Sequence, residues 1–446
     1  MPANRTDSDN SERWHFAPIV LVFVALSLAY NALMRLGLGP DEPRHYNYVP
    51  LMVEQRQLPR TLPDGTELGG AIVLHPPLYY SILALFYVPA KALGGPWLVQ
   101  RVFRLLSTGF GAITLALIWA TCRRIFPRRP SLALFIPALV ALWPHFVMDH
   151  SVINNDNGAN LVGALFVYFL VSRPRDGWRP RAALVAGVLV GIGGLMKGQL
   201  LLCLPPVLLA IMAWDHGSGF LRRIGFWRSL AVSGGAALLV SGPWYARNIV
   251  LYGQFTPVPG GYTVIPPGVS FFELWRAGGA HKLVGDALVG IFHSIWAQVG
   301  WFPQSLGRPL YGILGGLLVL AALGWAVIAL KLRGGVLVPA ARQSRHFSAA
   351  FLPFVLICAL TIYVTMYVHF GAHQGGRYTL FAIGGFAAFL AAGWRAAVPR
   401  RFRLLGAVLV LAFFVVLNAV SMWNLITYLN PTYAPDMTFW TPIRGT

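Results

Sequence analysis

Charged residues are scarce in this 446-residue sequence, and acidic ones most of all. Asp and Glu number 15 against 35 Lys and Arg, and the four types together make up only 11% of the chain. A soluble domain normally carries about 25% charged residues. Hydrophobic residues make up 56%. This composition excludes an ordinary soluble protein and predicts an integral membrane protein.

Several motifs that would define other protein classes are missing. The three cysteines, Cys122, Cys203 and Cys358, have neither the paired spacing of a zinc site nor an outer-loop pair for a disulfide. No nucleotide-binding glycine loop is evident, and we see neither an internal repeat nor a separate soluble domain. The first apolar run lacks a small-residue cleavage site after it, so we expect a retained anchor helix rather than a signal peptide.

The formal net charge is +20, which in a soluble protein would suggest a nucleic-acid partner. Here the basic residues lie in short segments between apolar runs, where they act as signals of membrane topology. We therefore expect no nucleic-acid partner.

Twelve apolar segments are candidate membrane helices, which need roughly 20 mostly apolar residues to cross a bilayer. They are 16–38, 76–93, 98–121, 131–148, 158–172, 182–196, 199–214, 229–248, 310–330, 348–370, 377–394 and 404–424. If all twelve crossed, the Arg-rich segment 122–129 would lie outside, against the positive-inside bias. If the aromatic-rich segment 76–93 instead lies in the outer interface, every cytoplasmic loop becomes basic.

The sequence thus predicts an all-α integral membrane protein with about 11 transmembrane helices and juxtamembrane helices in its first outward loop. We expect one membrane domain over 1–446, with a cytoplasmic N-terminus and an outward C-terminus. The two large outward loops are 39–97 and 249–309. Nearly all polar residues of functional interest fall on the outward face.

An acidic pair, Asp41 and Glu42, directly follows the first apolar segment. Adjacent carboxylates at a membrane surface can act as a general base toward an acceptor hydroxyl, because neighbouring negative charge and partial desolvation raise a carboxyl pKa. Asp41 could equally cap a juxtamembrane helix that continues to about Gln57, since Asp is a favoured residue at that position. Taken alone, the pair favours the cap.

A polar turn, His150 to Asn157, lies between two predicted crossings and contains Asn155 and Asp156. Amide and carboxylate side chains in such a run can hold sugar hydroxyls or a divalent cation. The same residues are also common in turns and at helix starts. Both interpretations stay open.

Three cations fall on the predicted outward face, where the positive-inside bias disfavours them: Lys197, Arg247 and Arg377. A phosphate or diphosphate is the natural partner for such side chains. Contact with lipid headgroups is the alternative for each one. Headgroup contact explains a single outward cation well, but it explains the presence of all three less well.

Aromatic and histidine residues in the outward segments give weaker signals. Trp296 and Trp301 could stack on sugar rings, although an interfacial aromatic belt is the more frequent explanation. His369 and His373 stand four apart, but no firm third ligand accompanies them. We therefore assign no metal ligands, and a divalent cation stays open.

Seven motifs in order resemble the GT-C superfamily of membrane glycosyltransferases, and the resemblance covers most of the chain. The branch it resembles includes protein O-mannosyltransferases and lipid A aminoarabinose transferases. The motifs are the Asp41-Glu42 pair, His-Pro-Pro-Leu-Tyr-Tyr (75–80), Asn-Asn-Asp (154–156), the turn with Lys197, Trp-Tyr-x-Arg-Asn-x-x-x-Tyr-Gly (244–253), Trp-x-x-x-Gly-Trp (296–301) and Gln-Gly-Gly-Arg-Tyr (374–378).

The resemblance implies an inverting glycosyltransferase with a polyprenyl-phosphate sugar donor, acting at the outer face of the cytoplasmic (inner) membrane. Asp41 would be the general base, Glu42 would support it or engage the acceptor, and Asp156 would be a second acidic residue. Lys197, Arg247 and Arg377 would bind the carrier phosphate. The candidate substrate-binding residues are His45, Tyr48, His75, Asn155, Trp296, Trp301 and Gln374.

Two departures from the family pattern limit what carries over. The chain ends about 20 residues after its last predicted helix, so we expect no large soluble C-terminal domain of the kind that some relatives use for their acceptor. The acceptor, whether lipid, glycan or protein, is therefore open, as are the sugar, the carrier length and the oligomeric state. Metal dependence varies within the branch.

A transporter of a small or lipid-linked solute is the main alternative. Its signature would be ionisable residues and broken helices near the bilayer midplane, with repeats in the two halves. Here the predicted helix interiors hold few charges and no repeat is visible. The sequence favours the glycosyltransferase.

Overall fold

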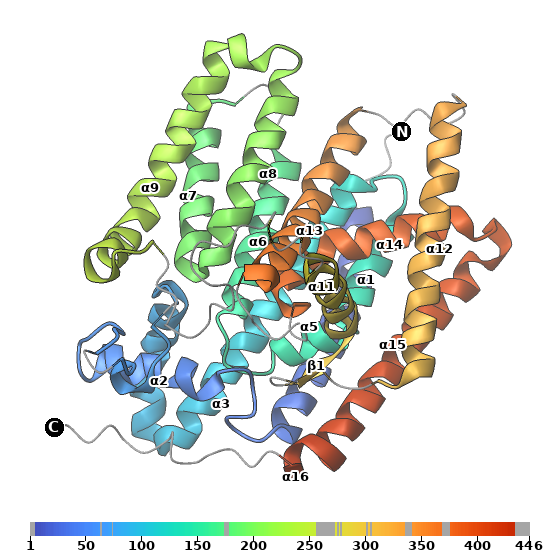
Figure 1. Cartoon of the computed structure of the whole chain (residues 1–446). Coiled ribbons are helices and arrows are strands. Elements are labelled where there is room, and N and C mark those ends of the chain that lie inside the picture. The colour runs from blue at the N-terminus through green and yellow to red at the C-terminus, as the bar shows by residue number, and fades with distance from the viewer. Residues whose placement is uncertain are drawn as a thin grey trace.

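The computed structural model describes residues 5–62, 65–73, 75–173, 178–255, 273, 276, 279–299, 302–303, 306–334, 341–367 and 375–432. These residues form an almost entirely helical protein, and the predicted all-α class is confirmed (Figure 1). The described strands, β1 (Gln298–Val299) and β2 (Phe302–Pro303), make one short antiparallel hairpin.

Eight helical stretches among the described residues are long and apolar enough to cross a membrane. The predicted number of about 11 crossings stays a prediction. The long helices are α1 (Arg5–Leu33), α3 (Leu78–Ile125), α6 (Asp156–Ser172), α7 (Pro180–Met196), α8 (Gly198–His216), α9 (Ile224–Tyr252), α11 (Gly279–Trp296), α12 (Arg308–Arg333), α13 (Ala341–Tyr367), α14 (Ile383–Ala397) and α15 (Arg403–Asn424).

Shorter elements connect the long helices. They are α2 (Glu42–Val53), η1 (Leu68–Gly70), α4 (Pro130–Ala141), α5 (Pro144–Asp149), η2 (Phe220–Arg222), η3 (Arg377–Ala382), η4 (Arg400–Phe402), η5 (Leu425–Leu429) and α16 (Asn430–Thr432). Helix α2 belongs to the first predicted outward loop, where a juxtamembrane helix was expected.

Helix α3 joins two segments that were predicted as separate helices. Gly94 and Gly95 interrupt it with non-helical backbone, and Gly95 has a φ of 62° and a ψ of −162°. Only glycine adopts that conformation readily. The segment before the break therefore need not continue in the direction of the segment after it, and its interfacial placement stays a prediction.

The predicted helix over 131–148 is instead two helices, α4 and α5. Leu142 and Trp143 leave the helical conformation between them, and Trp143 has a φ of −75° and a ψ of 111°. The ring of Pro144 disfavours the helical region for the residue before it, which explains the break. The break turns the short α5 and its last residue, Asp149, toward the polar turn.

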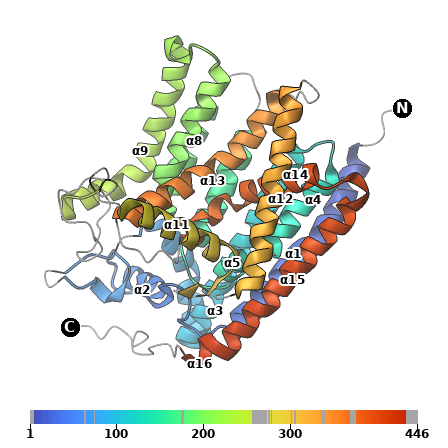
Figure 2. The same ribbon diagram turned by 45° about the vertical axis from the view of Figure 1, so that its right-hand side comes forward.

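Polar connections gather at one end of the bundle. Helices α2 and α16 lie toward the lower end in both ribbon views, and α5 and β1 lie in the lower half of Figure 1, whereas the α8–α9 connection and the N-terminal end of α1 lie at the opposite end (Figures 1 and 2). The first loop and the end of α5 are thus neighbours in space, although about a hundred residues of sequence lie between them.

Helices α7 and α9 approach closely at Gly187. A Cβ atom there would overlap the backbone carbonyl oxygen of Ser233 and lie 2.8 Å from the Cβ of Ala236. Small residues permit such close helix packing in membranes. We expect Gly187→Ala to lower the free energy of unfolding by about 1–3 kcal/mol, the usual cost of overpacking.

Thermal unfolding of the purified protein in detergent measures this effect. Gly235→Ala, on α9, is the matched control because nothing lies within 4 Å of a Cβ at that position. Equal shifts in the two variants would show that the α7–α9 contact does not limit stability.

Candidate active site

Asp41 stands immediately before α2 with an unusual backbone conformation. Its φ of 54° and ψ of 15° lie in the left-handed region, and its side chain makes no capping hydrogen bond to the helix. Asp41 thus occupies the predicted N-cap position without making the capping hydrogen bond, and α2 ends at Val53 rather than near Gln57. A non-glycine residue in this conformation costs roughly 1–2 kcal/mol. Such strain without a cap suggests a functional constraint.

The Asp41 carboxylate is turned into the protein, where only 9% of the residue is exposed. Oδ1 lies 3.3 Å from Nη1 of Arg44, and Oδ2 lies 4.0 Å from Nη2 of Arg377. Burial raises the pKa of Asp41 above its ordinary value, although the neighbouring Arg377 and Arg44 act to lower it. Asp41 is thus a buried carboxylate of raised basicity.

Glu42 points elsewhere and is fully engaged. Arg104 of α3 donates to both of its oxygens, Nε to Oε1 and Nη2 to Oε2, each at 2.7 Å. Backbone N–H groups of Gly37, Gly39 and Ile153 donate to the same carboxylate at 3.0, 3.2 and 3.1 Å. Glu42 is wholly buried. These contacts leave it no oxygen for chemistry, so it fixes the loop that carries Asp41.

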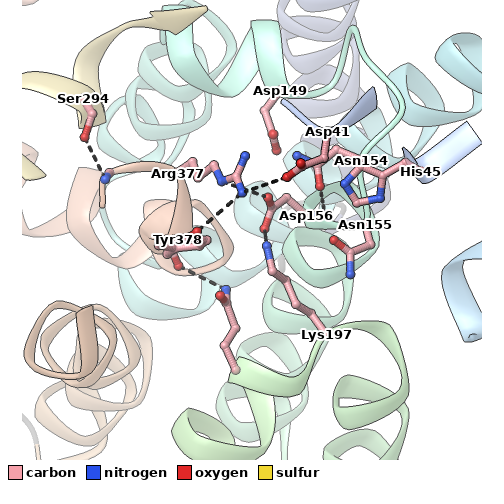
Figure 3. Close-up of polar contacts among 12 residues, drawn as sticks. Asp41, His45, Asp149, Asn154, Asn155, Asp156, Lys197, Ser294, Arg377 and Tyr378 are labelled. Atoms are coloured by element: carbon pink, nitrogen blue, oxygen red, sulfur yellow. Dashed lines mark hydrogen bonds and ion pairs between the residues drawn. The ribbon is translucent and has the colours of Figure 1, made fainter. Parts of the chain in front are cut away.

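Asp156 begins α6 and meets two cations. Lys197 forms an ion pair with Oδ1, and Nε of Arg377 lies 3.8 Å from Oδ2 (Figure 3). Burial acts to raise the pKa of Asp156, but the charges of Lys197 and Arg377 outweigh it and the pKa is lowered. Asp156 therefore stays ionised.

Arg377 faces both Asp41 and Asp156 (Figure 3). It opens η3, and the backbone N–H of Gly376 donates to Oγ of Ser294 at 2.8 Å. A Cβ at Gly376 would lie 2.6 Å from Cα of Ile295. Glycine therefore precedes Arg377 because the backbone must approach α11 that closely.

A third carboxyl group, Asp149, completes the cluster. It ends α5, points toward Arg377 and Asp156 in Figure 3, and accepts a hydrogen bond from Nδ2 of Asn160 at 3.1 Å. Burial, with the nearby Asp156 charge, raises its pKa well above the ordinary value. Asp41, Asp149 and Asp156 thus lie near the two cations Lys197 and Arg377.

Neutral imidazoles flank the cluster. The Nδ2 group of Asn155 donates to the carbonyl of Met196 at 3.1 Å, which fixes the orientation of the amide, and to Nδ1 of His75 at 2.5 Å. Burial lowers the pKa of His75 to about 3. Because Nδ1 accepts, the proton of this neutral ring is on Nε2.

His45 is the second of these neutral imidazoles. Its Nδ1 lies 2.7 Å from the hydroxyl of Tyr80, and burial lowers the pKa of His45 well below the usual range. Tyr48 stacks on Tyr80 with ring centroids 3.7 Å apart and donates to the carbonyl of His75 at 3.1 Å. His45, Tyr48, His75 and Asn155 thus lie together, and their role in substrate binding stays a prediction.

Two of the remaining predicted residues lie apart from the carboxylates. Arg247 donates to the carbonyl of Pro59 at 2.8 Å and covers the ring of Trp244, so it holds the first loop against α9. Trp296 is 1% exposed and stacks on Trp143 in the core, which corrects its predicted role in sugar stacking. Trp301, His369, His373 and Gln374 lie outside the described residues.

Sequence reasoning missed Arg104, Asp149 and the contact of Arg44 with Asp41. Arg104 carried a usable signal, because an arginine inside an apolar run needs a buried partner. Within the described residues, no three His, Cys, Asp or Glu side chains converge on a metal site. The cations next to Asp41 and Asp156 are side chains.

The helical architecture is that of a multi-pass membrane protein, and its fold is similar to that of GT-C membrane glycosyltransferases. Residues 74–245 match the family model described as dolichyl-phosphate-mannose-protein mannosyltransferase. The resemblance to GT-C membrane glycosyltransferases is therefore confirmed. No curated protein sequence matches the chain.

Solved structures that are similar to this chain include one archaeal and one bacterial membrane enzyme. The apo oligosaccharyltransferase of Archaeoglobus fulgidus has a TM-score of 0.54 at 12% identity, over 93% of this chain and 56% of that one. The same enzyme tethered to an acceptor peptide has a TM-score of 0.51 at 14% identity, over 93% of this chain and 55% of that one. ArnT of Cupriavidus metallidurans bound to undecaprenyl phosphate has a TM-score of 0.48 at 17% identity, over 92% of this chain and 73% of that one. This chain thus spans little more than half of the oligosaccharyltransferase.

Proposed function

We propose that this protein is a glycosyltransferase that moves a sugar from a polyprenyl-phosphate carrier to an acceptor at the outer face of the cytoplasmic membrane. The observation that carries the proposal is the strained Asp41, which makes no capping hydrogen bond and whose buried carboxylate faces Arg377 beside Asp156. The match to a dolichyl-phosphate-mannose-dependent family supports a lipid-phosphate donor.

In the proposed reaction, Asp41 accepts the proton of the acceptor nucleophile. The acceptor atom bonds to the anomeric carbon, the bond from that carbon to the phosphate oxygen breaks, and the electron pair leaves with the phosphate. A single displacement of this kind inverts the anomeric centre. Cations stabilise the charge that develops on the leaving phosphate.

Arg377 is the best-placed phosphate ligand among the predicted cations. Its separations of 4.0 Å from Asp41 and 3.8 Å from Asp156 exceed a hydrogen bond, so it can turn to a phosphate without breaking one to either carboxylate. Lys197 is a second candidate that also keeps Asp156 ionised. Arg247 would act indirectly, because it holds the first loop in place.

Unsatisfied polar atoms support a sugar subsite next to Asp156. The Oδ1 atom of Asn155 and the Nδ2 atom of Asn154 are buried without a hydrogen-bond partner among the described residues. Buried polar atoms are normally paired, so an unpaired set beside a charged cluster fits a ligand with hydroxyl groups. The Nε2–H of His75 and the imidazole of His45 would add neutral contacts.

The function is tested with purified protein in liposomes and a panel of radiolabelled polyprenyl-phosphate sugars. We expect release of unlabelled polyprenyl phosphate together with transfer of the label to an acceptor in a membrane extract. Solute movement into sealed liposomes without release of sugar from any donor would support the transporter instead and overturn the proposal.

The raised pKa of Asp41 predicts the acid limb of the pH profile. A general base works only when it is ionised, so kcat/KM should fall as the pH drops through this pKa. The limb should lie above the ordinary Asp value of about 3.9 because burial raises the pKa. Initial rates at pH values where thermal unfolding shows the protein intact measure the limb. A flat profile down to pH 4 contradicts the assignment.

His75 is expected to bind substrate as a neutral donor. His75→Ala should lower kcat/KM by about 10-fold, the cost of one hydrogen bond of roughly 1.4 kcal/mol. His75→Gln keeps an N–H donor and should recover most of that loss, with an unchanged pH profile. Steady-state kinetics of both variants decide this. Equal losses in both, with a shifted pH limb, would instead assign acid-base chemistry to His75.

A further inference from the structure

A second polar site lies at the other end of α3, away from the carboxylate cluster. A cavity of about 370 Å³ opens there, lined by Ala120, Arg123, Arg124, Phe126, Pro127, Pro130, Ala133 and Tyr168. Arg104 and Arg124 lie on the same helix, and the 20 residues from one to the other span about 30 Å, the thickness of the hydrocarbon core. The cavity is therefore at the opposite membrane surface from Asp41.

The cavity is strongly cationic. Arg123 and Arg124 come from the last turn of α3, and none of the eight lining residues is acidic. Nη2 of Arg124 lies 3.4 Å from the hydroxyl of Tyr168, and its guanidinium covers that ring with 5.4 Å to the centroid. Arginine and a phenol hydroxyl together form a donor set for phosphate oxygens.

The first turn of α4 adds to the positive potential. Pro130 and Ala133 line the cavity from that turn, so the positive end of the 12-residue helix is directed at it. Arg128 and Arg129 precede the helix and are exposed at the same surface. A bound anion would therefore meet charge from two helices and the turn between them.

The rest of the lining is apolar, which distinguishes a lipid from a soluble anion. Ala120, Phe126, Pro127 and Ala133 contribute hydrocarbon surface. Leu165, one turn from Tyr168 on α6 toward the active-site end, is 36% exposed on the apolar exterior. Acyl chains that leave the cavity would follow this surface into the bilayer. A soluble phosphate would use none of it.

We propose that this cavity binds the phosphate headgroup of an anionic phospholipid of the cytoplasmic leaflet. The phosphate lies between Arg123, Arg124 and the Tyr168 hydroxyl, and the glycerol end contacts the apolar wall. Basic pockets at the cytoplasmic ends of membrane helices recognise such headgroups. The assignment to this leaflet rests on the topology predicted from the basic loops, and it is independent of the sugar-transfer proposal.

Thermal stabilisation of the full-length protein in detergent, with added phosphatidylglycerol, tests the site, because a ligand that binds the folded state raises the unfolding temperature. We expect phosphatidylglycerol to raise it for the wild type and phosphatidylcholine to do so much less. Arg123→Gln/Arg124→Gln should at least halve the phosphatidylglycerol shift. Arg222→Gln/Arg223→Gln, another arginine pair on the basic side, should keep it.

A second variant covers the case in which the arginine double variant does not fold. Ala120→Leu fills the cavity from its apolar wall with both arginines in place, and it should also reduce the shift. A full shift in both cavity variants, or an equal loss in the Arg222/Arg223 control, overturns the proposal. The same shift with inorganic phosphate overturns the lipid assignment in favour of a soluble anion.

Discussion

Replacement of Asp41 by Asn is expected to lower the rate of sugar transfer by about 10²–10⁴-fold, the usual contribution of a general base. Asn has nearly the same shape as Asp and tolerates the left-handed conformation that Asp41 adopts, so the loop should keep its geometry. The substitution therefore removes basicity and little else. Single-turnover transfer from a labelled polyprenyl-phosphate sugar measures the chemical step directly.

Glu54→Gln is the matched control for this variant. Glu54 follows the other end of α2, its side chain is 44% exposed, and it pairs with Lys91 at the surface. Its loss should change the transfer rate little. The unfolding temperature of Asp41→Asn should match the wild type within a few degrees, which excludes a folding defect. Transfer by Asp41→Asn within about threefold of wild type would remove Asp41 from the proton-transfer step, because a base contributes far more.

The meeting of Asp41 with Asp156 was predictable from the sequence. Asp41 follows one apolar segment and Asp156 precedes another, and the charge pattern of the loops predicts that both residues lie on the same membrane face. In the structure Arg377 lies near both carboxylates and Lys197 pairs with Asp156, and these contacts link α2, α6, η3 and the α7–α8 turn. Local pattern and topology together suffice for this part of the site.

The separate role of Glu42 could not be predicted in this way. Two adjacent carboxylates suggest shared chemistry, but the left-handed turn at Asp41 sends them in different directions. The partner of Glu42 is Arg104, 62 positions away on another helix. A side-chain pair across that distance leaves no spacing signal, and only the buried arginine in an apolar run hints at it.

Asp149 and Trp296 were misjudged for a related reason. Asp149 follows the segment 131–148 that was predicted as one helix and was given no role, whereas the break before Pro144 turns α5 so that Asp149 reaches the cluster. Trp296 fell in an outward loop that contains a helix, and α11 packs it against Trp143. Helix breaks and loop packing depend on tertiary contacts that hydropathy does not record.

Disruption of the Glu42–Arg104 pair is expected to have the largest effect on stability. Both side chains are buried, and Glu42→Gln leaves the Arg104 charge without its counterion. Removal of one partner of a buried ion pair typically costs about 3–5 kcal/mol. Glu42→Gln should therefore lower the unfolding temperature strongly and reduce the yield of folded protein, as measured by thermal unfolding and size-exclusion chromatography in detergent.

The double variant Glu42→Met/Arg104→Met separates stability from activity. A well-packed apolar pair can replace a buried ion pair at little net cost, so much of the lost stability should return. Activity should not return, because the N–H groups of Gly37, Gly39 and Ile153 lose the acceptor that fixes the Asp41 loop. Lys91→Gln, which breaks an exposed pair, should cost at most about 1 kcal/mol. Full activity in the double variant would show that the pair stabilises the fold without positioning Asp41.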